Sequence, residues 1–216
     1  MKEKVILFDL DGTLIDSTDA IVGTFNHSFK QLGFDFAGTD EDIKNEIGYP
    51  LDIMYATLGV HKEKVQDFVD AYKNRYRQIS LEQTYILPDA VECLKLASSF
   101  ARLGIVTTKT TQYTIPILED MDIMQYFEVI VGRQEVVNPK AHPEPVLKAM
   151  EMMDVTNSNY DIYMIGDTKL DLIAAKEAGV HGIGVLCGYG KREELKQYTT
   201  IVVSNSLNAV QRISNH

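Results

Sequence analysis

Side chains able to do chemistry follow four separate apolar runs of this chain. The runs at 5–8, 103–106, 129–131 and 162–165 are each short and apolar, as buried strands are. The polar residues that follow them are Asp9 and Asp11, Thr107, Lys140, and Asp167 with Asp171. In an open parallel sheet the carboxyl ends of the strands share one edge, and ligands bind there. The set therefore predicts one site that combines carboxylates with an amine and a hydroxyl.

The polar residues that follow the first apolar run also have a simpler interpretation. Asp and Gly are common turn formers, so Asp9, Asp11 and Gly12 taken alone can be a polar turn after a buried strand. Polar residues also follow the three other apolar runs, which favours one shared site over four unrelated turns.

Four carboxylates at one sheet edge need a counter-charge. Two carboxylates about 5 Å apart repel each other by roughly 3 kcal/mol at an effective dielectric constant near 20. Without a cation, their pKa values would rise or the fold would lose stability. A hard dication resolves this repulsion, and an oxygen-only set with few protein ligands suits Mg²⁺.

Thr107 and Lys140 would add a hydroxyl donor and a positive charge at the same edge, which suit an anionic group. Most lysines are solvated, but the position of Lys140 between two strands of this pattern favours a role on that group and not in folding. Lys109 has two interpretations that the sequence leaves open, a helper at the site or a surface lysine.

Four stretches of the chain resemble the motifs of the haloacid dehalogenase-like hydrolases, in particular of the phosphoglycolate phosphatase-like and pyrophosphatase-like members. They occur in the family's order, spread over most of the chain, as FDLDGTLIDS, LGIVTTK, NPKAHPEPVLKAM and MIGDTKLDLIAAKEAG. Ala141 departs from the pattern, because the family usually has proline directly after the lysine. Proline fixes its own φ, so the change concerns the stiffness of the loop and leaves Lys140 in place.

The resemblance implies a role for each residue at a matching position. Asp9 would be the nucleophile that forms an aspartyl-phosphate, and would also bind the metal. Asp11 would act as acid and base, with its backbone carbonyl on Mg²⁺. Asp167 would be a direct metal ligand, while Asp171 would orient metal-bound water or Lys140. The phosphate-binding residues would be Thr107, Thr108, Lys140 and Gly12.

These motifs predict a Mg²⁺-dependent phosphatase that acts on a small phosphate compound, such as 2-phosphoglycolate or pyrophosphate. The dehalogenase branch of the family fits less well, because a halide leaving group requires neither the proton of Asp11 nor the metal at Asp167. The alternative is a sugar phosphate mutase of the phosphoglucomutase type, which uses the same core motifs. A non-catalytic binding protein on the same fold is disfavoured, since every motif residue is retained.

Composition limits the partners of the protein. The chain has 216 residues, 45% of them apolar, and its 31 acidic against 21 basic residues give a net charge of −10. This charge argues against nucleic acid or a membrane surface as a partner, because both are polyanionic. No apolar stretch has the length of a signal segment or a membrane span, and two cysteines are too few for a disulfide framework. We expect a cytoplasmic protein that is a monomer or a weak dimer.

Helices and strands alternate from residue 87 onward, which predicts an α/β fold with a doubly wound, Rossmann-like parallel sheet. Strands are expected at 5–8, up to Thr107, and at 128–132, 162–166, 182–186 and 200–203. One helix should open at Pro88-Asp89 and end near Gly104, and the next should be delayed or kinked by Pro116. Further helices are expected at 143–153, 170–178 and 192–198. The catalytic core should comprise residues 1–15 and 83–216.

Residues 16–82 show no strand pattern and are expected to form a small inserted α-helical cap. Two apolar stripes at helical spacing, at 21–32 and 65–76, are more typical of the insert's own core than of a cofactor site. Thr39 and Asp42 form a near capping box. The turn at Gly48 and Tyr49 resembles the cap turn of the phosphoglycolate phosphatase-like and pyrophosphatase-like proteins and is the candidate for substrate specificity. An ordinary turn between two helices is the alternative.

A glycine-rich stretch lies near the end of the chain. Its glycines at 182, 184, 188 and 190 do not have the spacing of a nucleotide-binding loop. They predict a flexible turn before the helix at 192–198, and contact between residues 188–191 and substrate is left open.

Overall fold

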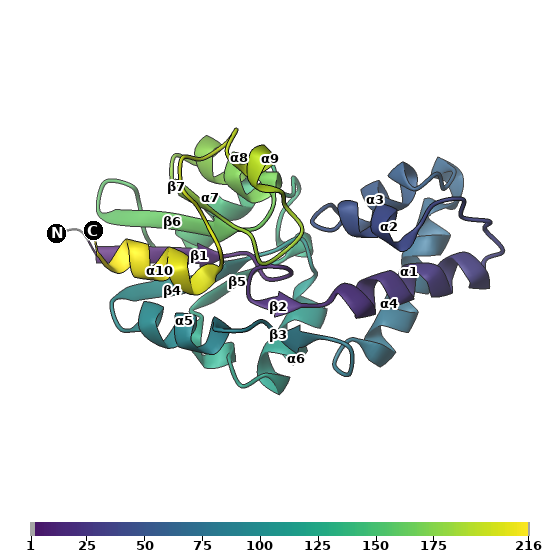
Figure 1. The fold of residues 1–216 in the computed structure, drawn as a ribbon, viewed down its shortest axis with the longest axis horizontal. Helices are drawn as coiled ribbons and strands as arrows, with labels where there is room; N and C mark the ends of the chain where they lie inside the picture. The colour runs from purple at the N-terminus through teal and green to yellow at the C-terminus, as the bar shows by residue number, and fades with distance from the viewer. Residues whose placement is uncertain (1–2, 216) are drawn as a thin grey trace. The chain divides into compact units, whose positions relative to one another are not determined.

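The computed structural model describes residues 3–215 (Figure 1). The chain divides into two compact units. The helical unit is Ser17–Tyr85, and the α/β unit consists of the chain before Ser17 together with the chain from Ile86 onward. The sequence suggested 16–82 for the inserted helical part.

The α/β unit is built on a parallel sheet with the strand order β5-β4-β1-β6-β7-β8. Its strands are β1 (Glu3–Phe8), β4 (Ala101–Val106), β5 (Val129–Val131), β6 (Tyr160–Gly166), β7 (His181–Val185) and β8 (Val202–Val203). Phe8, the last residue of β1, pairs with Ile105 of β4 on one side and with Ile165 of β6 on the other. The polar residues that follow these three strands therefore come out at the same edge of the sheet.

Both faces of this sheet are covered by helices (Figure 1). Ile6 and Phe8 of β1 belong to an apolar cluster with helices α5 (Ala90–Ser98), α6 (Thr111–Asp120) and α10 (Ser206–Ser214). Val5 and Leu7 of β1 belong to a second cluster, with α7 (Glu144–Met152) and α8 (Lys169–Glu177). Successive strand residues point to opposite faces, so a continuous apolar run is what a doubly covered strand requires. The predicted doubly wound α/β fold is confirmed.

Short elements connect the larger ones. A second sheet pairs β2 (Ile15–Asp16) with β3 (Tyr85–Ile86). Three short helical segments follow in the α/β unit, at Met124–Tyr126, Arg133–Glu135 and α9 (Arg192–Leu195). The apolar pattern gave no signal for β2 and β3, because two residues are too few to show a period.

The helical unit contains α1 (Thr18–Gln31), α2 (Asp40–Asn45), α3 (Leu51–Thr57), a 3₁₀ turn (Lys62–Lys64) and α4 (Val65–Ile79). Its core is aromatic, with the rings of Phe25 and Tyr55 4.4 Å apart between centroids. Most of the two apolar stripes is buried as this unit's own core, as expected, although Leu32 at the end of the first stripe is exposed. Thr39 also caps α2 as expected, since its N–H and hydroxyl both donate to Asp42, at 2.7 and 2.8 Å.

Two expectations about the helices of the α/β unit were wrong. Helix α5 ends at Ser98, whereas Gly104 lies inside β4, where an added Cβ would come within 2.9 Å of the Val129 side chain. Crowding between strands, and not helix termination, explains that glycine. Helix α6 begins at Thr111 and continues through Pro116, so the proline does not delay it. Helix α10 was not anticipated.

Among the described residues, no helix has the length and apolar character to cross a membrane.

Candidate active site

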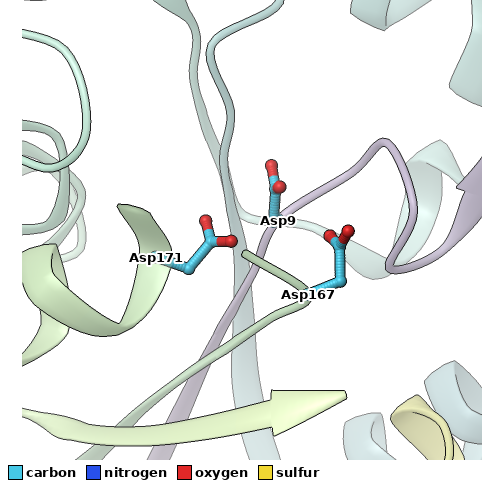
Figure 2. Close-up of side chains that lie close together, drawn as sticks. All are labelled: Asp9, Asp167 and Asp171. Carbon is cyan, nitrogen blue, oxygen red and sulfur yellow. The ribbon is translucent and has the colours of Figure 1, made fainter. Parts of the chain in front are cut away.

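Three buried aspartates lie together at the carboxyl edge of the sheet (Figure 2). Asp9 directly follows β1, and its N–H donates to the carbonyl of Ile165 in β6 at 2.9 Å. Asp167 directly follows β6, and Asp171 lies in the first turn of α8. One carboxylate oxygen from each of the three lies within 4.8 Å of the others. The sequence-predicted carboxylates therefore converge, apart from Asp11.

Lys140 is the counter-ion inside this cluster. Its Nζ lies 2.8 Å from Oδ1 of Asp9 and 2.5 Å from Oδ1 of Asp171, and donates to the carbonyl of Val106 at 3.0 Å. The side chain is 2% exposed. Lys140 lies on the connection between β5 and α7, directly before Ala141. The solvated-loop interpretation of this lysine is excluded.

Asp171 is committed to protein partners through both of its oxygens. Oδ1 accepts from Lys140, while Oδ2 accepts from the N–H and the hydroxyl of Thr168 at 3.0 and 2.8 Å, which caps the start of α8. Gly166 makes room for this carboxylate, because a Cβ there would lie 2.3 Å from Cγ of Asp171. These contacts fit the orientation of Lys140 better than direct metal binding.

Asp167 is held by residues that the sequence did not single out. The hydroxyl of Thr13 donates to its Oδ1 at 2.9 Å, and the N–H of Tyr189 donates to its Oδ2 at 2.8 Å. Gly188 and Gly190 allow this approach, because an added Cβ would come within 2.2 Å of Oδ2 and within 1.9 Å of the carbonyl oxygen of Asp167. The glycine-rich stretch expected to be a flexible turn is thus a close support for one carboxylate.

Burial and charge shift the titration of the cluster. Burial raises the pKa of Asp9 well above its ordinary value, with the charge of Asp171 adding to the rise and Lys140 opposing it. Burial, again together with Asp171, raises the pKa of Asp167 to about 7. Burial disfavours the ammonium form of Lys140, but Asp171 and Asp9 outweigh this and raise its pKa above the ordinary value. The lysine is therefore charged, while Asp9 and Asp167 hold protons more tightly than exposed carboxyls do.

Asp11 lies apart from the three-carboxylate cluster and pairs with Lys109. Its Oδ1 lies 3.2 Å from Nζ of Lys109, and the two side chains are 12% and 8% exposed. Lys109 is therefore not a surface lysine. Thr107 is buried, and its hydroxyl accepts from the N–H of Lys109 at 3.1 Å, while Thr108 is half-buried.

Gly12 has a φ of +80° and lies against Asp167, where an added Cβ would meet Oδ2 at 2.5 Å. The glycine is thus required by backbone conformation and by space, whether or not it also binds phosphate.

Gly48 and Tyr49 lie in the helical unit, between α2 and α3. Gly48 has a φ of +110°, which favours glycine, and the N–H of Tyr49 donates to the carbonyl of Glu46 at 3.1 Å. The structure describes a tight turn here, and the specificity role of these residues stays a prediction.

The donor set fits a divalent cation that prefers oxygen. Three buried carboxylates share one ammonium, so a further positive charge would relieve their repulsion. The raised pKa values of Asp9 and Asp167 report the same repulsion and burial. Asp171 is paired with Lys140 through Oδ1 and caps α8 through Oδ2, whereas the donors to Asp167 are a neutral hydroxyl and a neutral N–H, so Asp9 and Asp167 are the carboxylates better placed to hold the ion.

Comparisons with known proteins identify the family of this chain. Residues 6–185 match the family model described as haloacid dehalogenase-like hydrolase. The phosphoglycolate phosphatase of Shigella boydii is 30% identical over 227 residues, which cover 94% of this chain and 89% of that protein. The phosphoglycolate phosphatase of Salmonella typhi is 29% identical with the same coverage. A solved haloacid dehalogenase-like family hydrolase from Streptococcus pneumoniae is 27% identical, with a TM-score of 0.87 over 98% of both chains.

Proposed function

This chain belongs to the haloacid dehalogenase-like hydrolases and is a phosphatase, and we propose that it hydrolyses 2-phosphoglycolate or pyrophosphate with Mg²⁺ through a phosphorylated Asp9. The relatives at 29–30% identity are phosphoglycolate phosphatases, which supports 2-phosphoglycolate as the first substrate to test.

The observation that carries the proposal is the position of Lys140. Its buried ammonium touches the carboxylate of Asp9, so a phosphoryl group brought to Asp9 would meet a positive charge within reach of its oxygens. Asp171 holds the other side of the same ammonium and keeps it from leaving the site. A nucleophile beside a fixed cation is the arrangement that phosphoryl transfer needs.

In the first step an oxygen of Asp9 attacks phosphorus, and the bond from phosphorus to the leaving oxygen breaks. Asp11 gives its proton to that oxygen, so the leaving group departs as an alcohol or as phosphate. Lys140 and the donors near Thr107 hold the transferring oxygens. The product on the protein is a mixed anhydride between Asp9 and phosphate.

In the second step water attacks the phosphorus atom and Asp11 takes a proton from it. The bond between phosphorus and the Asp9 oxygen breaks, which restores the carboxylate and releases inorganic phosphate. Mg²⁺ bound by Asp9, Asp167 and the Asp11 carbonyl would supply the positive charge that lets a carboxylate approach a phosphate dianion.

Phosphate release from a panel of small phosphate compounds tests this proposal. We expect turnover of 2-phosphoglycolate or pyrophosphate that requires Mg²⁺ and stops on chelation. Asp9→Asn should be folded, by circular dichroism, and inactive. Asp120→Asn, an exposed change at the end of α6, is the matched control and should keep full activity.

Acid quenching with labelled substrate tests the intermediate. Label should remain on a peptide that contains Asp9 in the wild type, and none should remain in Asp9→Asn. Interconversion of two sugar phosphates with little free phosphate would instead identify a mutase. Full activity in Asp9→Asn would contradict the mechanism.

A further inference from the structure

Lys109 is a lysine with a mostly covered side chain that the steps above do not use. It follows β4, and Asp11 follows β1, the neighbouring strand in the sheet. Their side chains form an ion pair with Nζ and Oδ1 3.2 Å apart. With only 8% of its side chain exposed, Lys109 has given up the hydration that a surface lysine keeps. A lysine pays this desolvation only where a specific partner compensates it.

The backbone of Lys109 is held as firmly as its side chain. Its N–H donates to the hydroxyl of Thr107 at 3.1 Å, and its carbonyl accepts from the N–H of Arg133 at 3.1 Å. Gly132 packs against the same carbonyl, and a Cβ there would lie 2.7 Å from it. The ammonium is therefore presented from a fixed backbone and not from a loose loop.

The two lysines of the site contact different carboxylates. Lys140 contacts Asp9 and Asp171, the nucleophile and its neighbour, whereas Lys109 contacts Asp11. Lys109 is therefore placed on a different carboxylate from the one that Lys140 serves as phosphate-binding charge. Its partner is the residue to which the mechanism gives the proton transfers.

We propose that Lys109 is a positioning residue for the acid and base Asp11, an inference that rests on the proposed function. The ammonium fixes one oxygen of the Asp11 carboxyl, so proton exchange falls to the other oxygen. When that oxygen hands its proton to the leaving group, the negative charge forms beside the ammonium. Lys109 keeps all of its own protons throughout, and the substrate meets it only through Asp11.

A double-mutant cycle with two matched substrates tests the role of Lys109. The variants are Lys109→Met, Asp11→Asn and the pair, and the substrates are phenyl phosphate and p-nitrophenyl phosphate, which differ chiefly in the leaving group. Phenol is the poorer leaving group and needs the proton more. We expect Lys109→Met to lower kcat on the order of tenfold or more for phenyl phosphate and clearly less for p-nitrophenyl phosphate. In the Asp11→Asn background the same change should cost no more than about twofold, because residues that act through each other are not additive.

Three controls separate positioning from folding. Lys109→Arg keeps the charge and should recover most of the loss for phenyl phosphate. Lys95→Met, an exposed lysine on α5, should change neither substrate. If Lys109→Met does not fold, as judged by thermal melting, Lys109→Gln takes its place in the cycle with the same expected results.

The outcomes distinguish this inference from the proposed function. Two results with an active wild type would overturn the role of Lys109 and leave the phosphatase mechanism standing. In one, Lys109→Met lowers kcat equally for both substrates; in the other, the losses from Lys109→Met and Asp11→Asn are fully additive in the double variant. A wild type that releases no phosphate from any substrate would overturn the proposed function itself, and the inference with it.

Discussion

The two units of this protein treat polar side chains in opposite ways. Among the described residues, the charged side chains that are buried all lie in the α/β unit: Asp9, Lys140, Asp167 and Asp171. The buried polar residues of the helical unit all carry hydroxyls: Ser17, Thr24, Ser28, Ser80 and Thr84. Burying a charge is costly unless it is paired, so such charges mark the place where function outweighs stability.

Two hydroxyls of the helical unit are satisfied within their own helix, although Oγ of Ser28 also lies 2.7 Å from the hydroxyl of Tyr55, and Oγ1 of Thr84 has no hydrogen-bond partner among the described residues. Thr24 donates to the carbonyl of Ala20 at 2.6 Å, and Ser28 donates to that of Phe25 at 2.7 Å, both within α1. The charges of the α/β unit are instead satisfied by residues far apart in the sequence, as Lys140 is by Asp9. The helical unit thus holds its own core, while the α/β unit holds a cluster whose charges depend on one another.

Removing Lys140 tests this contrast most severely. We expect Lys140→Ala to lower turnover on the order of 10² to 10³, because the phosphoryl group loses its cation. The free energy of unfolding in urea should fall by about 3–5 kcal/mol without Mg²⁺, since Asp9 and Asp171 are left buried without a counter-charge. The position of Lys140 in the sequence had suggested no role in folding, whereas its burial leads us to predict a loss of stability.

Lys148→Ala is the control for Lys140→Ala. Lys148 pairs with Glu151 at 2.8 Å, but the two side chains are 39% and 71% exposed. Exposed pairs contribute about 0–1 kcal/mol, so stability and activity should hardly change. Equal losses of stability in the two variants would break the distinction between buried and exposed charge.

The support of Asp167 gives the next largest expected effect. Thr13→Val removes the hydroxyl that orients this carboxylate and should weaken Mg²⁺ binding about 10- to 100-fold, as changes behind a metal ligand commonly do. Calorimetric titration with Mg²⁺ measures this without any turnover. Thr13→Ser keeps the hydroxyl and should bind Mg²⁺ nearly as well as the wild type. Unchanged affinity in Thr13→Val would show that the hydrogen bond does not orient a ligand.

Titration of Asp167 predicts how stability depends on pH. Its pKa is about 7 in the folded protein and about 4 when unfolded, so the folded state binds the proton more tightly. The metal-free protein should therefore lose stability as pH rises from about 4 to about 7. Mg²⁺ should stabilise the protein more at pH 8 than at pH 5, because protons compete for the same carboxylates. Melting curves with and without Mg²⁺ measure both effects, and Asp167→Asn should flatten them.

The smallest expected effect concerns the turn in the helical unit. Gly48→Ala or Tyr49→Phe should lower kcat/KM for 2-phosphoglycolate on the order of tenfold and spare p-nitrophenyl phosphate. The reason is that selection of a small substrate rests on a few contacts. Steady-state kinetics on both substrates measures the ratio. If kcat/KM fell equally for both substrates, these residues would support the fold of the helical unit and not the selectivity of the enzyme.

The sequence by itself determined the α/β alternation, the strand ends and the carboxylates that follow them. Apolar runs that stop at Asp9, Thr107 and Asp167 are local signals, and a doubly covered parallel sheet brings such ends to one edge. The capping residue Thr39 was equally legible, because its partner Asp42 lies three residues away. Structural features that depend on residues close together in the sequence could therefore be predicted. Two predictions based on helix-breaking residues were wrong. Gly104 lies in β4, where crowding by the neighbouring strand requires glycine, and Pro116 lies inside α6, where the rest of the helix tolerates it.

Only the tertiary structure decided which atoms hold the site together. The hydrogen bonds from Thr13 and Tyr189 to Asp167 join three segments of the chain, and no spacing in the sequence predicts them. The choice between a surface and a buried Lys109 likewise depends on the distance between the ends of β1 and β4. A hydrogen bond needs its two atoms placed within a few tenths of an ångström, and the packing of the whole sheet sets that placement.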